Sequence, residues 1–309
     1  MRGSPRISRR GRAMAICALA AVLGTVQEAR ADLTRKDVQE VKKTVIFLGL
    51  LRGDQEPVFM GTGFLMRVES VYFLVTARHV VAEFRDGAYT GSLLDQDLYV
   101  FLNNRNGHVG ARSLAQAREG PPGAEWIFHD DPQVDLAMLP LQLDREVEDF
   151  LTIPDHLIVK ASELYETQQV FFLSFQLGVK GASRVEPVFR QGMISLKQDE
   201  KSFFVDGFAF PGNSGSPVFL MPQPLRFTDT GLTLGDKLGG KFIGVVGQYV
   251  SYNEVAVSKK SLRPRVVYEQ NVGLSRVWAA ELLEEMTAYP RFRDQIESLK
   301  LQESKAVLP

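Results

Sequence analysis

The sequence has almost no cysteine, since Cys17 is the only one among 309 residues. Cys17 lies in an amino-terminal segment that we expect to be removed, so the mature chain is predicted to have no thiol and no disulfide. A domain without cross-links must be stabilised by its hydrophobic core. This composition favours an exported bacterial protein over a eukaryotic extracellular one.

The sequence also lacks a strong bias in charge. Its formal net charge is −1, and residues 32–309 carry 30 basic and 36 acidic side chains, a net of −6. The mature chain is therefore mildly acidic and has no basic stripe, which argues against nucleic-acid binding. Apolar residues make up 45% and charged residues 24% of the chain. This balance excludes extensive disorder and allows a large core or two packed halves.

No apolar run has the length expected of a transmembrane helix. The mainly apolar residues 13–26 follow an arginine-rich start and precede Ala29-Arg30-Ala31, a small-x-small sequence. This pattern predicts a signal peptide over residues 1–31 and a bacterial periplasmic or secreted protein that is free of the membrane after cleavage. An uncleaved membrane anchor is the alternative, and the pattern leaves Sec and twin-arginine export open.

From residue 44 onward, short β-like runs alternate with Gly, Asn, Asp and Pro. The runs cover residues 44–51, 61–66, 71–76, 98–102, 169–175, 203–210, 217–219, 242–249 and 265–272. Many short strands with turn signals between them predict an all-β fold of barrels or sandwiches. The length suits two barrels, and we place them at residues 32–160 and 161–275, with a polar connection around residues 155–168.

The end of the chain has a different periodicity. Residues 275–288 alternate apolar and acidic side chains at a spacing typical of an amphipathic helix. Pro290 can open a second helix at its first position. Residues 276–309 are therefore predicted to be a helical extension that packs on the second barrel, with partner or membrane-surface binding as the alternative.

Three short segments carry the residue types of nucleophilic catalysis. In FLVTARHVV, an apolar strand ends in Thr-Ala and delivers His79, and in VDLAML, Asp135 stands at the head of an apolar strand. In FPGNSGSPV, a glycine-bearing turn carries Ser214 at its tip. Each segment alone is weakly diagnostic. Together, in the order His, Asp, Ser on a β-rich chain, they favour a serine nucleophile.

The chemistry explains why these three residue types belong together. A serine hydroxyl is a poor nucleophile and needs an adjacent base, which histidine supplies because its pKa lies near neutrality. A buried carboxylate then fixes the imidazole tautomer. We assign these roles to Ser214, His79 and Asp135. The glycines of the turn let backbone N–H groups converge, so we assign the oxyanion hole to the N–H groups of Gly212 and Ser214.

Chain order excludes the α/β-hydrolase triad, which runs Ser, Asp, His. All four histidines precede Ser214, namely His79, His108, His129 and His156. Asp130 and Asp131 are the alternatives to Asp135 as the acid. Their position before Pro132 is more typical of a turn.

At these segments the sequence resembles the trypsin/chymotrypsin superfamily and, within it, the bacterial HtrA-like, trypsin-like peptidases. GTGFL at residues 61–65, QGMIS at 191–195 and GVVG at 244–247 are similar to further strands of that family. The resemblance covers about residues 42–277. It implies two six-stranded antiparallel β-barrels, polypeptide substrates, and no metal or other cofactor. The chain leaves no room for a PDZ domain, so we expect it to lack that regulatory module.

Three departures from the family pattern bear on function. Ser216 stands where the family commonly has glycine, and we expect the change to be tolerated. Asn213 replaces the aspartate with which digestive proteases bind a new amino terminus, so activation of that kind is not expected. Residues 220–241 form a long Gly- and Pro-bearing loop, either a specificity or regulatory element or an ordinary surface insertion.

Substrate preference is predicted from five positions. Phe208 stands six residues before the nucleophile, where trypsin keeps an aspartate, and Val246, Gly247, Gln248 and Tyr249 are expected to wall the primary pocket. We therefore expect uncharged P1 side chains.

The function predicted from the sequence is an exported serine endopeptidase that acts through an acyl-enzyme. Two alternatives are a catalytically silent binding module with the same fold and a chaperone-like protein that holds unfolded chains. The sequence does not give the oligomeric state or the natural substrate.

Overall fold

The structure is a computed structural model, and it divides the chain into a large unit, Arg35–Met221 with Gly240–Pro309, and a small unit, Met1–Thr34 with Pro222–Gly239. The described residues are 35–51, 57–85, 88–93, 98–114, 125–176, 185–222, 225–228, 231–234, 240–261 and 263–306. The predicted signal peptide, residues 1–31, lies outside them. All candidate site residues belong to the large unit.

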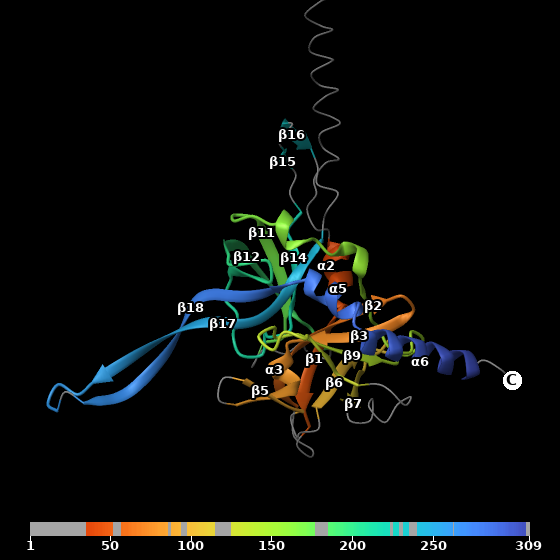
Figure 1. Ribbon diagram of the computed structural model, residues 1–309, viewed down its shortest axis with the longest axis horizontal. Coiled ribbons are helices and arrows are strands. Elements are labelled where there is room, and N and C mark those ends of the chain that lie inside the picture. Colours follow the sequence, from red (N-terminus) through yellow and green to blue (C-terminus); the bar gives the residue numbers. More distant parts are fainter. Residues whose placement is uncertain are drawn as a thin grey trace, which may run out of the picture. The chain divides into compact units, whose positions relative to one another are not determined.

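The amino-terminal half of the large unit is an eight-stranded sheet with the order β7-β6-β1-β2-β3-β9-β8, and β10 pairs with β2 (Figure 1). Its strands are β1 Val45–Leu50, β2 Val58–Val68, β3 Val71–Thr76, β6 Leu98–Asn103, β7 Val109–Ser113, β8 Ile127–Phe128, β9 Ala137–Leu141 and β10 Ile153–Pro154. The β10–β2 pair is parallel and the other pairs are antiparallel.

This half forms the second sheet that accompanies the closed barrel in the expected chymotrypsin-like fold. Closure requires a ladder between the two edge strands. Among the described residues, none joins β7 to β8, and β8 has only two residues. The all-β, chymotrypsin-like fold class predicted from the sequence is confirmed.

The carboxy-terminal half is a closed antiparallel barrel of six strands in the order β11-β12-β13-β18-β17-β14. Its strands are β11 Gln169–Ser174, β12 Val188–Lys197, β13 Ser202–Asp206, β14 Pro217–Leu220, β17 Phe242–Val257 and β18 Pro264–Ala279. The strand predicted over residues 203–210 ends at Asp206, because the following segment turns toward the nucleophile loop. The second barrel thus matches the expected architecture.

Two further hairpins are described. β4 Ala82–Arg85 pairs with β5 Ala88–Leu93 in the large unit, and β15 Leu225–Thr228 pairs with β16 Gly231–Leu234 in the small unit. The long loop predicted over residues 220–241 therefore contains a hairpin of its own.

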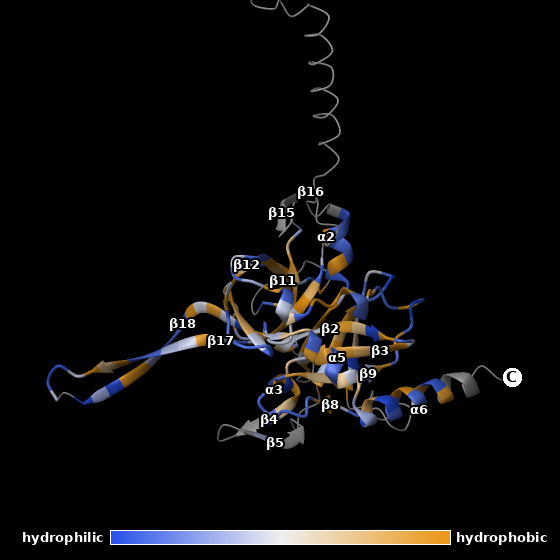
Figure 2. Cartoon of the chain, turned by 45° about the horizontal axis from the view of Figure 1, so that its top comes forward, coloured by the Kyte–Doolittle hydropathy of each residue, from blue (hydrophilic) through white to orange (hydrophobic). Residues whose placement is uncertain are grey.

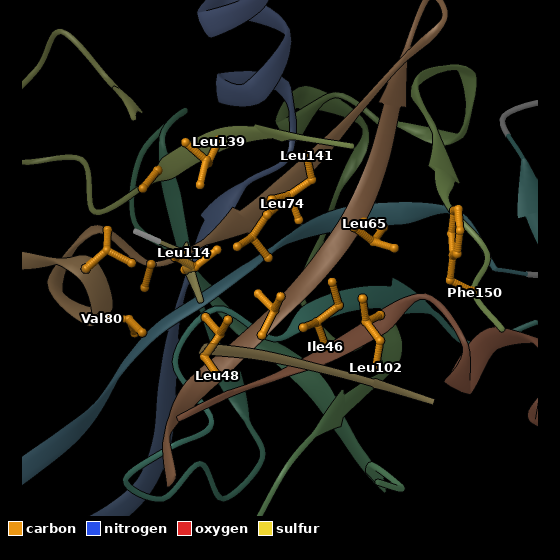
Figure 3. Packing of buried hydrophobic residues seen from close by; sticks show 14 residues of the cluster. Ile46, Leu48, Leu65, Leu74, Val80, Leu102, Leu114, Leu139, Leu141 and Phe150 are labelled. Atoms are coloured by element: carbon orange, nitrogen blue, oxygen red, sulfur yellow. The ribbon is translucent and has the colours of Figure 1, made fainter. Parts of the chain in front are cut away.

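Each half of the large unit buries a separate apolar cluster. In the first half, Ile46, Leu48, Leu65 and Leu74 meet between the strands, as Figure 3 shows. The second half has its own cluster around Phe172, inside the closed barrel. Two cores in one chain explain how the fold is stabilised without disulfides, because each half buries its own apolar side chains.

Among the described residues of the large unit there are also four helices and two short 3-10 turns. The helices are α2 Arg35–Lys42, α3 Arg78–Val81, α5 Glu281–Thr287 and α6 Pro290–Ala306, and the turns are η2 Asp155–Leu157 and η3 Ala161–Glu163. No helix among the described residues is long and apolar enough to cross a membrane.

Two expectations about the carboxy-terminal helices are corrected. The helix predicted over residues 275–288 begins only at Glu281, because the preceding residues pair with β13 and β17 as the end of β18. The second helix packs on the first half, where the buried ring of Phe292 stacks on Phe73 of β3 at 4.7 Å. Pro290 is the first residue of α6, as predicted. The alternating apolar and polar residues of α6 are visible in Figure 2.

Replacing Phe292 by alanine should remove this contact and leave a cavity beside β3. We expect Phe292→Ala to lower the free energy of unfolding by about 3–5 kcal/mol, the usual cost of deleting a buried phenylalanine ring. Denaturant-induced unfolding measures the change. Leu301→Ala, on the same helix but 56% exposed, is the control and should change it by less than about 0.5 kcal/mol. Equal effects of the two changes would contradict the packing of α6.

Candidate active site

His79 lies where β3 gives way to a single helical turn. β3 ends at Thr76, the buried Ala77 follows, and α3 begins at Arg78. Val80 and Val81 are buried and anchor the turn in the first core. The His79 side chain is left 36% exposed, so it is fixed in position and open to solvent on one side.

Asp135 reaches His79 because β9 pairs with β3. Thr76 pairs with Ala137 in antiparallel register, which puts the residues after Thr76 and those before Ala137 at the same end of the sheet. Asp135 Oδ2 lies 2.7 Å from His79 Nδ1, and Asp135 Oδ1 accepts a hydrogen bond from the His79 backbone N–H at 2.9 Å. The carboxylate therefore holds both the ring and the backbone of the histidine.

The electrostatics of the pair favour a charged imidazole. Burial alone would lower the pKa of His79, but the negative charge of Asp135 and its hydrogen bond outweigh that effect, so the pKa is raised above its ordinary value. The ring can therefore accept a proton more readily than a free histidine.

The two alternative acids have other partners. Asp130 forms an ion pair with Arg291 at 2.6 Å, and Asp131 forms one with Lys201 at 2.5 Å. Among the described residues, Asp135 is the carboxylate that contacts His79.

The turn that carries Ser214 is held by the buried side chain of Asn213. Asn213 Oδ1 accepts a hydrogen bond from the Phe210 N–H, and Asn213 Nδ2 donates to the Phe175 carbonyl, both at 2.8 Å. The Asn213 backbone N–H also donates to the Phe210 carbonyl at 2.9 Å. The amide thus uses both its acceptor and its donor inside the protein.

The backbone N–H groups of the turn divide into two sets. Those of Asn213, Gly215 and Ser216 donate to backbone carbonyls. In the part of the chain that the structure describes, no carbonyl accepts a hydrogen bond from the N–H of Gly212 or Ser214. These two are the donors that the sequence assigned to the oxyanion hole, and that assignment stays a prediction.

Gly215 brings the Ser214 turn against the strand end that precedes His79. Its φ of +86° is in the left-handed region. A Cβ atom there would lie 2.0 Å from the Thr62 carbonyl oxygen and 3.1 Å from the Ala77 nitrogen, so only glycine fits. The serine turn of the second barrel is thereby packed against the first half, two residues before the histidine.

Thr62 stabilises the contact between the serine turn and the first half through hydrogen bonds. Its N–H donates to the Ser214 carbonyl at 3.0 Å, and its hydroxyl donates to the Gly212 carbonyl at 2.9 Å. The same hydroxyl accepts a hydrogen bond from the Phe175 N–H, and the Thr62 carbonyl accepts one from the Thr76 hydroxyl. Thr62 is fully buried, so all its polar groups are satisfied by the two halves together.

Comparison with protein-family models identifies the family of the chain. A family model described as a trypsin-like peptidase domain matches residues 61–222, which is more than half of the chain. The chain belongs to the trypsin-like peptidase family. No curated protein matches it in a comparison of whole sequences. The family supports a peptidase function, and the matched residues include His79, Asp135 and Ser214.

The five residues predicted to form the specificity pocket lie in different environments, some exposed and others buried. Phe208 is 55% exposed and its ring lies beside Gly273, where an added Cβ would be 3.3 Å away. The Val246 side chain is buried in the barrel core, although its backbone bonds to the serine turn. Gly247 lies near Asp135, since a Cβ there would be 3.6 Å from Oδ2.

The other two predicted pocket residues lie further along β17. Gln248 is exposed. Tyr249 is half-buried, and its hydroxyl donates a hydrogen bond to the Glu269 carboxylate at 3.1 Å. No finding tests the pocket assignment, which stays a prediction for all five residues.

Sequence reasoning missed Tyr89, which touches the acid directly. The Tyr89 hydroxyl of β5 donates to Asp135 Oδ1 at 2.5 Å, and burial together with the carboxylate raises the pKa of this phenol. Tyr89 therefore stays protonated and remains a donor. It lies in a turn-rich segment outside the three motifs, so no local pattern could have identified it.

Sequence reasoning also missed the role of Thr62, although it lies inside the GTGFL segment. Its position between two glycines gave no sign of the hydrogen bonds that it makes across the two halves. Those bonds depend on residues such as Gly212, which is 150 positions away in the sequence.

Replacing Asn213 by aspartate should weaken the serine turn at neutral pH. A carboxylate at this site would face the Phe175 carbonyl without a proton to donate, and we expect a loss of about 1–3 kcal/mol in the free energy of unfolding. Burial would raise the pKa of the new carboxyl, so stability is retained at low pH and lost as the pH rises through that pKa. Thermal unfolding from acidic to neutral pH measures this effect.

The control is Asn106→Asp. Asn106 is exposed, and its side-chain oxygen accepts a hydrogen bond from the His108 N–H. A carboxylate can replace that oxygen, so stability should not change. If Asn213→Asp were as harmless as this control, the donor role of the Asn213 amide would be refuted.

Proposed function

We propose that the protein is an exported serine endopeptidase that hydrolyses peptide bonds through His79, Asp135 and Ser214. The observation that carries the proposal is the 2.7 Å contact between His79 Nδ1 and Asp135 Oδ2, together with a serine turn packed against the strand end before His79. Export rests on the sequence of residues 1–31 alone.

The mechanism assigns one task to each residue. Ser214 Oγ attacks the scissile carbonyl carbon while His79 Nε2 takes the hydroxyl proton, forming a tetrahedral intermediate. The intermediate collapses to an acyl-enzyme as His79 gives that proton to the leaving amine. Water then repeats the sequence and releases the acid product. Asp135 keeps the proton of the imidazole on Nδ1 throughout.

The negative oxygen of each tetrahedral intermediate needs donors that are already in place. The N–H groups of Gly212 and Ser214 are suited to this because no carbonyl of the described residues uses them. Asn213 and Thr62 hold the backbone on either side of them. Losing one such donor typically costs about 100- to 1,000-fold in rate.

An uncharged P1 side chain fits the residues near Phe208. The exposed ring of Phe208 is apolar, and the guanidinium of Arg190 donates to the Phe208 carbonyl at 3.1 Å. A lysine or arginine side chain that reached this ring would approach another cation. We therefore propose that the enzyme does not require a basic P1 residue.

Labelling with a fluorophosphonate tests the nucleophile. Wild-type protein should react with the probe and cleave fluorescent casein, and Ser214→Ala should lose labelling and lower kcat by about 10⁶-fold. Ser216→Ala is a matched control two residues away and should still be labelled. Absence of labelling in folded wild-type protein would contradict the proposal and favour a silent binding module.

The pH dependence tests the pairing of His79 with Asp135. Because His79 must be neutral to act as a base and its pKa is raised, kcat/KM should rise with pH through a midpoint above 6.5. Asp135→Asn removes the charge that raises this pKa and leaves the effect of burial. We expect the midpoint to fall and kcat to drop by about 10⁴-fold.

Asp131→Asn is the control for that experiment. It removes a carboxylate that pairs with Lys201 and does not contact His79. Its pH profile should match that of the wild type. A midpoint that stays in place in Asp135→Asn would show that another group governs the histidine.

A further inference from the structure

The Asp135 carboxylate accepts hydrogen bonds from a second residue besides His79. In the part of the chain that the structure describes, its donors are the Tyr89 hydroxyl and two N–H groups of His79, one from the backbone and one from the ring. Oδ1 accepts the bonds from Tyr89 at 2.5 Å and from the His79 backbone at 2.9 Å, and Oδ2 accepts the bond from the ring at 2.7 Å. The Asp135 side chain is only 11% exposed, so water has little access to replace a lost donor.

The strand that approaches Asp135 from the second barrel offers no side chain in place of Tyr89. Gly247 of β17 lies near Oδ2, where an added Cβ would be 3.6 Å from that oxygen. The same Cβ would lie 2.6 Å from Trp278 Nε1, so a larger residue does not fit there. The hydroxyl comes instead from the β4–β5 hairpin, which is a separate two-stranded sheet.

Tyr89 is held over the acid by the cation that begins the histidine turn. The Arg78 guanidinium lies 4.4 Å from the centroid of the Tyr89 ring and 4.6 Å from that of Phe128. A guanidinium over an aromatic face is attracted by the ring. Phe128 of β8 pairs with Ala137, two residues after Asp135. The phenol of β5 is therefore packed beside α3 (Figure 1), and Arg78 links it to the strand next to the acid.

The charges around this phenol keep it a hydrogen-bond donor. Burial is the largest effect and, with the negative charge of Asp135, raises the pKa of Tyr89, whereas Arg78 opposes them. Arg291 is a further cation that acts on Arg78, and it is itself paired with Asp130. The charge that acts on the histidine is again that of Asp135. The hydroxyl therefore keeps its proton over the range in which a histidine titrates.

We propose that Tyr89 is a positioning residue that acts on His79 through Asp135: its hydroxyl shares the negative charge of the carboxylate with the imidazole, and so limits how tightly Asp135 holds the protonated ring. A hydrogen bond to a carboxylate stabilises its charge and weakens its pull on other partners. A general base must also release its proton, so this limit keeps His79 in a useful range. The role in catalysis rests on the proposed function, whereas the effect on the ring does not.

Removing the hydroxyl alone tests this effect. Tyr89→Phe keeps the ring over Arg78 and leaves both His79 bonds to the carboxylate in place. The carboxylate should then act more strongly on the imidazole, and the pKa of His79 should rise above its wild-type value. NMR titration of the imidazole protons measures it, and the absence of one signal in His79→Gln assigns the resonance. If Tyr89 only kept the acid within reach, its loss would lower this pKa.

A stronger donor at the same position should have the opposite effect. A fluorinated tyrosine incorporated only at position 89 keeps the hydroxyl and makes the phenol more acidic, so the pKa of His79 should fall below its wild-type value. The two replacements must therefore move the histidine in opposite directions. A general disturbance of the hairpin would move it in the same direction in both.

Tyr72→Phe is the matched control. The Tyr72 hydroxyl accepts a hydrogen bond from Arg145 Nε at 2.8 Å, and Tyr72 lies near the beginning of β3, whereas His79 follows its end. Loss of this hydroxyl should leave the pKa of His79 unchanged. Circular dichroism of each variant checks that the strands are retained.

Activity gives a second measurement, which depends on the proposed function. In Tyr89→Phe the midpoint of kcat/KM against pH should move to higher pH. Below both midpoints kcat/KM should fall by about two- to tenfold, because it falls tenfold there for each unit by which the midpoint rises. Above both midpoints the loss should be smaller.

The outcomes separate the role of Tyr89 from the proposed function. A pKa of His79 that falls or stays in place in Tyr89→Phe overturns the role of Tyr89, as does a fluorinated variant that moves it in the same direction as Tyr89→Phe. Opposite shifts of the expected signs support it, even in a chain that neither reacts with the fluorophosphonate nor cleaves casein. That last result would overturn the proposed function alone.

Discussion

The candidate site depends on the hydrogen bonds of Thr62. This residue sits in β2 of the first half, yet its N–H and hydroxyl both donate to carbonyls of the serine turn. It is fully buried, so each of these groups would be costly to leave unpaired. The two halves therefore cannot separate locally without exposing or orphaning these groups. His79 and Ser214 come from different halves, and their mutual position is set at this junction.

Asn213 holds the serine turn at the same junction between the two halves, from within the second half. In digestive proteases the equivalent aspartate needs a new amino terminus, whereas the Asn213 amide finds its donor and acceptor partners within the chain. A neutral amide in a buried site avoids the cost of an unpaired charge. The serine turn is therefore held by groups that are present in the intact chain. Activation without a freshly cut amino terminus stays a prediction from the sequence.

Sequence patterns predicted most of the strands and singled out Asp135, the carboxylate that contacts His79 among the described residues. β3 and β9 are short apolar runs, and the turn residues on either side of each run mark where the strand begins and ends. The same local logic failed at residues 275–279. Their spacing is compatible with a helix, but pairing with β13 and β17 satisfies their backbone as a strand. The sequence-based prediction also placed the last helix on the wrong half. The apolar spacing of Phe292 and its neighbours predicts that one face of the helix is buried, but it does not say which surface buries it.

The sequence by itself determined the residue types and their order: a histidine after an apolar strand, an aspartate before another, and a serine in a glycine-bearing turn. These are local properties, because strand periodicity and turn chemistry act over a few residues. Only the tertiary structure decided that Thr62 and Tyr89 form hydrogen bonds at the site and that the Val246 side chain belongs to the core. It also decided that β17 and β18 extend beyond their barrel. Each of these depends on contacts between segments far apart in the chain. Such contacts follow from how two separate cores and their strand edges fit together, which no short stretch of sequence encodes.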